Sequence, residues 1–372
     1  MTIDSIAETI ERALKSAGLE PRSAALKGVT ETIQQALASA GIAQRSSAAQ
    51  PADAAHLVAK PHLAGAWSDA VLRKQPPDTV AEPVNQSAHE PALGEFVMRS
   101  FSNAAGSRNY KLYVPTGYSG EPMPLLLMLH GCKQNPDDFA AGTRMNELAQ
   151  QHGFLVAYPE QTRKANGSNC WNWFQAAHQG RDGGEPQILA GIVGDVAVQC
   201  RIDSRRVFVA GLSAGAAMAV ILGQTHPDVF AGIGAHSGLP HGAGQDVASA
   251  FAAMHGGAAT RAAASQPGVP TIVFHGDHDR TVVAGNADAI VGHALGAQAS
   301  GSLTRETTSS AGSTRTVYRD AAGRAQVEQW LVHGAGHAWS GGSKKGSFTN
   351  PNGPDASAEM VRFFLARQGQ SH

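Results

Sequence analysis

The chain has 372 residues, of which 42% are hydrophobic and 16% are charged, and its formal net charge is −1. This length fits one large domain with an appendage, or two domains, and the apolar content is sufficient for a buried core. A nearly neutral chain without a basic run argues against nucleic-acid binding, and no stretch approaches the roughly 18 apolar residues of a membrane span. We therefore expect no nucleic-acid partner and no membrane-spanning segment.

The first residues and the cysteines indicate the cellular compartment of the protein. Met1–Ser5 contains neither the basic region nor the apolar region of a secretory signal. Three cysteines, Cys132, Cys170 and Cys200, cannot all pair within one chain. We interpret them as thiols in a reducing compartment and expect a cytoplasmic protein, while a Cys170–Cys200 bridge stays open.

The first 43 residues contain an internal repeat. Glu8–Leu19 recurs as Glu31–Ile42, with eight of twelve positions identical, and both copies have helical apolar spacing that ends at a glycine. We predict a pair of short amphipathic helices over residues 1–43. Such helices are marginal alone, so their apolar faces need a surface to pack on: each other, the main domain, or a partner. Residues 44–93 are rich in proline and small polar residues and predict a linker.

From residue 94 to residue 372, short apolar segments alternate with helical ones. Antiparallel strands are predicted over 94–101 and 108–115, and further strands over 125–129, 154–159, 206–210, 233–235, 271–274 and 327–331. Helices are predicted over 137–151, 188–201, 216–223 and 359–367. Strands that alternate with helices indicate an α/β domain with a mainly parallel, doubly wound sheet flanked by helices.

A serine at a tight strand-to-helix turn is the most informative motif. The apolar run 206–210 leads into Gly211-Leu212-Ser213-Ala214-Gly215, and an alanine-rich stretch follows. A Gly-x-Ser-x-Gly turn needs small residues because the backbone of the nucleophile is strained and neighbouring chains approach closely. The next helix points its N-terminus at the serine and favours developing negative charge. Ser213 is therefore the predicted nucleophile.

Acids and histidines follow the later strands. Acyl transfer at neutral pH needs an activated hydroxyl, a base that takes its proton, and a carboxylate that orients the base. Asp277 and Asp279 follow one buried strand, and the His-Gly-x-x-Asp-x-x-Val frame favours Asp279 as the acid. His333 and His337 follow the last strand, and the small residues 334–336 favour His337 as the base. The order Ser, Asp, His is the one expected for an α/β-hydrolase.

Two backbone N–H groups are predicted to form the oxyanion hole. One belongs to Ala214, the residue after the nucleophile. The other comes from the loop His130-Gly131-Cys132-Lys133-Gln134 after the strand 125–129, where we choose Cys132. His130 is interpreted as a packed, hydrogen-bonded histidine rather than a second base.

Several segments in this order resemble the esterase family of poly(3-hydroxybutyrate) depolymerases. They are Leu129–Gln134, Cys170-Trp171-Asn172-Trp173-Phe174, Gly211–Gly215, His275–Val282, Gly336–Gly342, Gly346–Pro351 and Gly353–Ser357. The resemblance covers roughly residues 95–367. It implies an α/β-hydrolase fold and a serine esterase that needs neither a metal nor a cofactor. Carried over by position, Ser213 is the nucleophile, Asp279 the acid and His337 the base, and Cys132 lies at the oxyanion loop.

Aromatic residues gather near the predicted catalytic loops. A hydrophobic polyester needs an exposed apolar platform. Trp171, Trp173, Trp339 and Phe348 are the predicted substrate contacts, with Trp339 favoured because it lies two residues past His337. The alternative for Trp171 and Trp173 is core packing beneath a loop.

The resemblance predicts hydrolysis of poly(3-hydroxybutyrate) or its oligomers. Many family members carry a secretion signal and a polymer-binding module, which this sequence does not show, so it looks more like the intracellular members. Residues 1–43 are a candidate for attachment to storage granules. An esterase acting on feruloyl, acetyl or small soluble esters shares every catalytic residue and is one alternative. A granule-associated binding protein on a hydrolase scaffold is an alternative of another class.

Overall fold

The computed structural model of the chain describes residues 94–256, 269–296 and 303–366. The predicted helix pair of residues 1–43 and the linker of residues 44–93 lie outside the described residues, so both stay predictions. Within those three ranges, no helix combines the length and the apolar character needed to cross a membrane.

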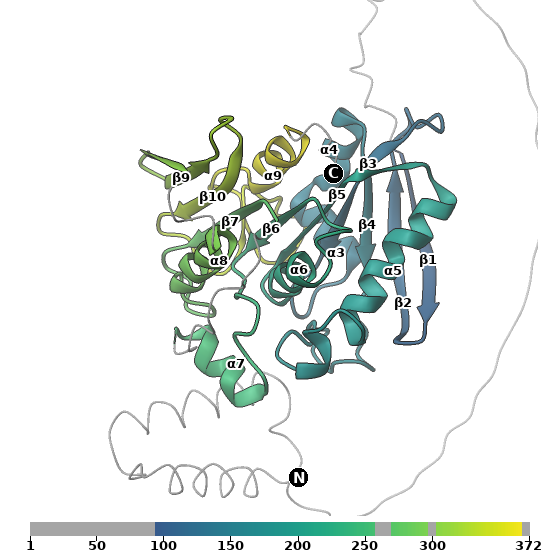
Figure 1. Ribbon diagram of the computed structural model, residues 1–372, viewed down its shortest axis with the longest axis horizontal. Coiled ribbons are helices and arrows are strands. Elements are labelled where there is room, and N and C mark those ends of the chain that lie inside the picture. The colour runs from purple at the N-terminus through teal and green to yellow at the C-terminus, as the bar shows by residue number, and fades with distance from the viewer. Residues whose placement is uncertain (1–93, 257–268, 297–302, 367–372) are drawn as a thin grey trace, which may run out of the picture. The chain divides into compact units, whose positions relative to one another are not determined.

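A mixed sheet of ten strands forms the centre of the fold (Figure 1). Its strands are β1 (Glu95–Asn103), β2 (Gly106–Val114), β3 (Met123–Leu129), β4 (Leu155–Pro159), β5 (Ile202–Leu212), β6 (Gly232–His236), β7 (Thr271–Gly276), β8 (Thr304–Ser309), β9 (Ser313–Arg319) and β10 (Ala325–Val332). They lie in the order β1-β2-β4-β3-β5-β6-β7-β10-β9-β8. The strands from β4 to β10 in that order pair in parallel, and the outer strands pair antiparallel. The predicted mainly parallel, doubly wound sheet is confirmed.

The strand β3 shows why both faces of the sheet are covered. Leu125, Leu127 and Leu129 join one buried cluster, whereas Leu126 and Met128 join a second cluster on the other side. Successive side chains of a strand point to opposite faces, so a strand buried on both faces reads as a continuous apolar run. The run 125–129 therefore marks a central strand of the sheet.

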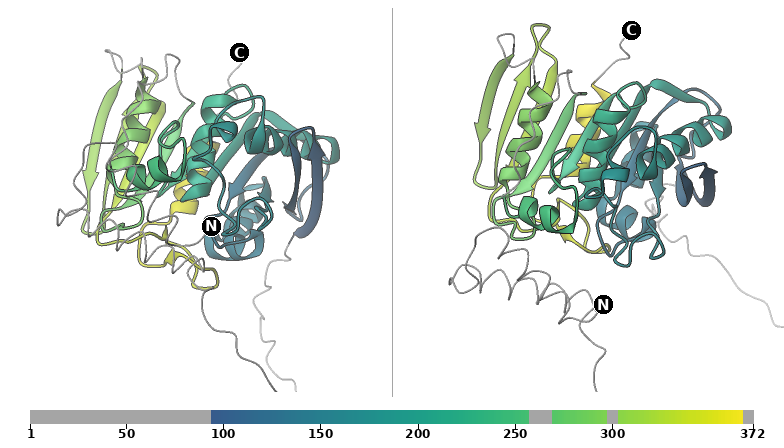
Figure 2. Two further views of the ribbon diagram at one scale, coloured as in Figure 1. Left: turned by 90° about the horizontal axis from the view of Figure 1, so that it is seen from below. Right: turned by 60° about the horizontal axis from the view of Figure 1, so that its bottom comes forward.

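Helices cover the two faces separately (Figures 1 and 2). One cluster holds residues of α5 (Gly184–Gln199), α6 (Ala214–Thr225), α7 (Val247–Met254) and α8 (Gly285–Leu295). The other holds residues of α3 (Pro136–Thr143), α4 (Met145–His152) and α9 (Ala356–Leu365). A short 3-10 helix η1 (Ala176–His178) and a two-stranded sheet of β11 (Trp339–Ser340) and β12 (Thr349–Asn350) lie in the loops.

The predicted helix over residues 137–151 is wrong as a single element. It is divided into α3 and α4 at Arg144, whose backbone is left-handed with a φ of 54°. The guanidinium of Arg144 lies 2.6 Å from the carboxylate of Asp355, at the start of α9. Because this partner is more than two hundred residues away in sequence, local spacing carries no signal of the break.

The hairpin of β8 and β9 and the helices α7 and α8 were not predicted by the sequence pattern. All six residues of β8 are exposed, so its sequence has no alternation of apolar and polar residues to mark a strand. The helix α8 contains Gly285 and Gly292, and glycine weakens a helical signal. The hairpin extends the sheet, and the two helices contribute residues to the buried cluster on one of its faces.

Candidate active site

Ser213 lies at the turn between β5 and α6, with φ 57° and ψ −119°. A left-handed backbone at a residue other than glycine is strained, and such strain concentrates at functional sites. A Cβ atom on Gly215 would lie 2.0 Å from the carbonyl oxygen of Leu129, and one on Gly211 would lie 2.5 Å from the backbone of Gly215. The two glycines therefore allow the close approach that presents the serine at the carboxyl end of β5.

The two candidate acids and the two candidate bases form separate pairs. Asp279 Oδ2 lies 2.6 Å from His337 Nδ1, whereas Asp277 Oδ2 lies 3.0 Å from His333 Nδ1. The Asp279 side chain is 0% exposed and that of His337 is 14% exposed. The second pair is open to solvent, with side chains 29% and 35% exposed. The two pairs thus have the same chemical groups in different surroundings.

Asp279 is held as a carboxylate by the groups around it. Its Oδ1 accepts hydrogen bonds of 2.9 Å from the backbone N–H groups of Thr281 and Val282. Burial alone would raise its pKa, but hydrogen bonds from His275 and His337 outweigh burial and hold the pKa of Asp279 well below its ordinary value. The side chain is therefore charged at neutral pH and can accept the Nδ1–H of His337.

The strands bring the nucleophile, the acid and the base to one edge of the sheet. Because β5, β6, β7 and β10 are parallel neighbours, the residues that follow their carboxyl ends meet at the same edge. A Cβ atom on Gly276 would lie 2.2 Å from the carbonyl oxygen of Ala335, so the acid loop and the base loop touch. The described contacts join Asp279 to His337 but include no hydrogen bond between Ser213 and His337.

His236 is a residue of this edge that the sequence pattern did not single out. Its carbonyl oxygen accepts the backbone N–H of Ser213 at 2.9 Å, and its Nε2 accepts that of Ser340 at 2.9 Å. The ring stacks on Trp339, with centroids 5.1 Å apart. Burial lowers the pKa of His236 to about 3, so the ring is neutral and can accept this hydrogen bond. His236 therefore connects the serine turn to the loop after His337.

The two predicted oxyanion donors are the backbone N–H groups of Cys132 and Ala214. Among the described residues, neither the backbone N–H of Cys132 nor that of Ala214 has an acceptor. Hydrogen bonds fix the loop on both sides of Cys132. Gly131 N–H donates to Gln134 Oε1 at 2.9 Å, and Lys133 N–H donates to the Ser168 carbonyl at 2.8 Å. Such a loop presents an unpaired donor with little freedom to move.

His130 is a packed histidine, as predicted. It is 1% exposed, its Nδ1 lies 2.8 Å from the carbonyl oxygen of Gly131, and its Nε2 accepts the backbone N–H of Gln161 at 3.1 Å. Burial lowers its pKa to about 4. Both ring nitrogens are thus engaged, which leaves neither free to act as a second base.

The interpretation of all three cysteines as thiols is wrong. Cys132 and Cys170 form a disulfide, and Cys200 is free. The open alternative, a Cys170–Cys200 bridge, is thereby excluded. The bridge joins the oxyanion loop to the loop before Trp171, two segments that are 38 residues apart and that sequence spacing alone does not bring together.

The prediction of an exposed tryptophan platform is also wrong. Trp171, Trp173 and Trp339 are only 0%, 6% and 1% exposed. The indole N–H of Trp171 donates to the carbonyl of His130 at 3.0 Å, and that of Trp339 donates to Ser357 at 3.0 Å. Core packing, the alternative for Trp171 and Trp173, is thus what the structure shows, and the buried indoles of Trp171 and Trp339 each have the partner that their N–H needs.

Phe348 differs from the three tryptophans because it is 44% exposed. Its φ of 52° is left-handed, and its carbonyl oxygen accepts the backbone N–H of Trp339 at 2.7 Å. The preceding Ser347 carbonyl accepts Gln134 Nε2 at 3.1 Å. Phe348 is therefore an exposed aromatic ring attached both to the oxyanion loop and to the segment after His337.

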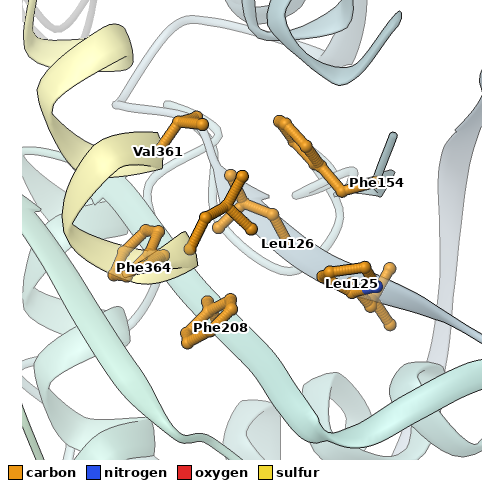
Figure 3. Close-up of a pocket in the computed structure, with 8 residues that line it drawn as sticks. Leu125, Leu126, Phe154, Phe208, Val361 and Phe364 are labelled. Atoms are coloured by element: carbon orange, nitrogen blue, oxygen red, sulfur yellow. The ribbon is translucent and has the colours of Figure 1, made fainter. Parts of the chain in front are cut away.

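An apolar pocket lies between β3, β5 and α9 (Figure 3). All its lining residues are apolar: Pro124, Leu125, Leu126, Phe154, Phe208, Val361, Phe364 and Leu365. Leu126 pairs with Phe208, five residues before Ser213, so the pocket lies beside the middle of the two strands rather than at the turn that carries Ser213. It brings no acid, base or nucleophile together. The described ranges also contain no group of three His, Cys, Asp or Glu side chains placed to hold a metal ion.

Comparison with known proteins gives a family and two bacterial relatives. Residues 108–319 match the family described as Esterase PHB depolymerase. Poly(3-hydroxyalkanoate) depolymerase C of Paucimonas lemoignei is 30% identical over 250 residues, which cover 64% of this chain and 60% of the relative. Poly(3-hydroxybutyrate) depolymerase of Ralstonia pickettii is 31% identical over 252 residues, which cover 62% of this chain and 50% of the relative. The chain thus spans between half and two thirds of the length of these relatives.

A solved structure has the same fold. The acetyl xylan esterase from Aspergillus awamori matches with a TM-score of 0.58 and 18% sequence identity, over 73% of this chain and 100% of that one. At this identity the likeness concerns the fold alone. It agrees with the mainly parallel sheet and flanking helices and with the α/β-hydrolase fold that the order of Ser213, Asp279 and His337 predicts.

Proposed function

Since the chain belongs to the Esterase PHB depolymerase family, we propose that it is a serine esterase that hydrolyses poly(3-hydroxybutyrate) or its oligomers. The observation that carries the proposal is the hydrogen bond of 2.6 Å between Asp279 and His337, at the sheet edge where a strained turn carries Ser213. The names of the two bacterial relatives support a polyester as the substrate.

The proposed mechanism has two half-reactions. In the first, Ser213 Oγ attacks the ester carbonyl while His337 Nε2 takes its proton, and His337 then returns that proton to the leaving alcohol. In the second, His337 takes a proton from water, the water attacks the acyl-enzyme, and Ser213 leaves with the proton. The backbone N–H groups of Cys132 and Ala214 stabilise the oxyanion of each tetrahedral intermediate.

Asp279 has an electrostatic part in both half-reactions. Its low pKa keeps it ionised while His337 carries a second proton. A buried carboxylate beside the imidazolium stabilises that charge and holds the ring in the tautomer with a proton on Nδ1. In that tautomer Nε2 carries no proton, which the attack by Ser213 requires.

Phe348 is the proposed substrate contact. Its ring is exposed, and hydrogen bonds to the backbone carbonyls join residues 347 and 348 to both predicted catalytic loops. Phe348→Ala should raise KM for a polymer or oligomer more than for a short soluble ester, because only a longer substrate reaches an apolar contact beyond the reacting group. Met98, which is exposed on the edge strand β1, gives the control Met98→Ala with unchanged KM on both substrates.

The direct test is the release of 3-hydroxybutyrate from amorphous granules of the polymer, with a short-chain nitrophenyl ester in parallel. The proposal expects release that disappears in Ser213→Ala. Turnover of the soluble ester alone would move the function to small or acetyl-type esters. Activity on neither substrate would favour a granule-binding protein on a hydrolase scaffold.

Attachment to storage granules through residues 1–43 is part of the proposal and rests on the repeat in the sequence. A deletion of residues 1–43 should release the protein from granules while hydrolysis of the soluble ester persists. Granule binding that survives the deletion would exclude this role.

A cytoplasmic location is proposed from the sequence, and the disulfide weighs against it. Disulfides are typical of oxidising compartments and rare in the cytosol. Alkylation of the protein without prior reduction shows whether Cys132 and Cys170 are oxidised or reduced. An oxidised protein takes up one alkyl group at Cys200, whereas a protein with all of Cys132, Cys170 and Cys200 reduced takes up three.

A further inference from the structure

A buried carboxylate lies beneath the oxyanion loop and has no part in the mechanism above. Glu185 is the second residue of α5 and is 1% exposed. Its Oε2 accepts the backbone N–H of Asn172 at 2.7 Å, and its Oε1 accepts the Asn172 side-chain amide at 2.9 Å. Arg108 donates to Oε1 at 3.2 Å, and the side-chain amide of Gln161 donates to the same atom.

Each partner of Glu185 in the loops reaches the oxyanion loop by another contact. Gln161 donates its backbone N–H to His130 Nε2 at 3.1 Å and its side-chain amide to the Cys170 carbonyl at 2.9 Å. Asn172 is preceded by Trp171, whose indole donates to the His130 carbonyl, and by Cys170, which is bonded to Cys132. One carboxylate thus fixes two segments that hold the oxyanion loop.

The chemistry of this site requires a carboxylate. All four contacts of Glu185 are with donors, and a carboxylate is a pure acceptor with two oxygens. Glutamine has the same shape but would turn an NH₂ group toward the N–H of Asn172 or toward the donors at Oε1. At least one buried donor would then lose its partner, and the loop would shift to relieve the clash.

We propose that Glu185 is a positioning residue for the oxyanion hole, acting through Gln161 and Asn172 on the backbone N–H of Cys132. The inference rests on the proposed function, because it concerns the oxyanion donor of that reaction. Oxyanion donors act only when they are fixed where the charge develops, so a small displacement of Cys132 weakens binding of the transition state more than binding of the substrate.

The test compares Glu185→Gln with Glu328→Gln. Glu328 is also buried and is also bound to arginines, Arg315 at 2.9 Å and Arg362 at 2.5 Å, but it lies within β10 away from the catalytic loops. Glu185→Gln should lower kcat on a soluble ester by about 10- to 100-fold with KM changed less than about twofold, since misplacement by 1 Å costs about 10²-fold. Glu328→Gln should lower the melting temperature and leave kcat unchanged.

A transition-state analogue separates positioning from a general loss of structure. An alkylboronic acid forms a tetrahedral adduct with a catalytic serine, and its affinity should fall by the same factor as kcat in Glu185→Gln. Glu185→Asp keeps the charge and should restore part of kcat and of that affinity. If Glu185→Gln does not fold, Glu185→Asp measures the same two quantities at a milder displacement.

Three results discriminate among the outcomes. Equal kcat values for Glu185→Gln, Glu328→Gln and the wild type would overturn the positioning role. A loss of kcat in Glu185→Gln without a matching loss of boronic-acid affinity would overturn it too. Full activity in Ser213→Ala would instead overturn the proposed function itself, so the two failures are distinguishable.

Discussion

Two aspartate–histidine pairs follow β7 and β10, and they differ in surroundings rather than in chemistry. Asp279 and His337 are 2.6 Å apart and largely buried, and Asp277 and His333 are 3.0 Å apart and open to solvent. Water screens the exposed pair, so its members gain little from each other. The carboxylate of Asp279 is buried, so water screens its charge less and its interaction with the ring of His337 is stronger. A hydrogen-bonded pair alone therefore does not identify a catalytic acid and base.

The second pair has a structural task of its own. Asp277 Oδ1 accepts the backbone N–H of Gly334 at 2.7 Å, and His333 Nε2 lies 3.0 Å from Thr314 Oγ1 on β9. These contacts hold the start of the base loop against the sheet. The exposed pair therefore stabilises the chain segment that precedes His337, whereas the buried pair performs the proposed chemistry.

Removing the two histidines should give the largest contrast. His337→Ala should lower kcat by about 10⁶-fold, the scale seen when the base of a serine hydrolase is deleted. His333→Ala should leave kcat within about twofold, because the exposed ring touches no predicted catalytic group. Steady-state rates on a soluble nitrophenyl ester measure both, and comparable losses in the two variants would erase the distinction between the pairs.

Removing the two acids should give a smaller contrast. Asp279→Asn should lower kcat by about 10⁴-fold, because an amide next to Nδ1 favours the wrong tautomer of His337. Asp277→Asn should change kcat by less than about twofold, since its carboxylate binds His333 and the backbone N–H of Gly334 but no predicted catalytic group. The same assay measures both variants, and a large effect of Asp277→Asn would assign the acid to the exposed pair.

Acid stability should separate the two aspartates by a smaller effect. The pKa of Asp279 lies below its value in the unfolded chain, about 3.9, so the unfolded state takes up more protons as the pH falls. The stabilisation is present above about pH 4 and is lost progressively below it. Urea unfolding should therefore show a shallower loss of stability below pH 4 in Asp279→Asn than in the wild type. Asp277→Asn should show a smaller change in the same direction, because the hydrogen bond from His333 also lowers the pKa of Asp277. Equal slopes in all three proteins would contradict the account.

The coupling within the exposed pair should be the smallest effect. A double-mutant cycle of Asp277→Ala and His333→Ala should give a coupling of about 0.2–1 kcal/mol in the free energy of unfolding, the usual range for exposed ion pairs. High salt should reduce it further. A coupling of several kcal/mol would show that the two side chains interact as strongly as a buried ion pair does.

The sequence could predict the local parts of the site because each depends on a short motif. Ser213 lies between two glycines, and the turn has no room for a side chain at either of them. Asp279 and His337 each follow an apolar strand. Parallel neighbouring strands then bring their carboxyl ends together whatever the loops do. Asp279 and His337 were favoured over their neighbours by motif, and the structure joins these two in one hydrogen bond.

The parts that sequence missed depend on contacts between distant segments. The Cys132–Cys170 bridge and the burial of Trp171 arise because the loop 161–172 folds beneath the oxyanion loop, and no local spacing encodes that placement. Glu185 looks like an ordinary acid in the first turn of a helix until its partners are known. Aromatic residues near a catalytic motif indicate a packed site as readily as a binding surface, and only burial separates Trp339 from Phe348.

The most direct measurement is labelling with a fluorophosphonate, which phosphonylates an activated serine, followed by peptide mapping of the labelled residue. The account predicts one adduct on Ser213, labelling that nearly stops in His337→Ala, and an unchanged rate in His333→Ala. An adduct on another residue, or equal slowing by the two histidine substitutions, would contradict the assignment of the buried pair to catalysis.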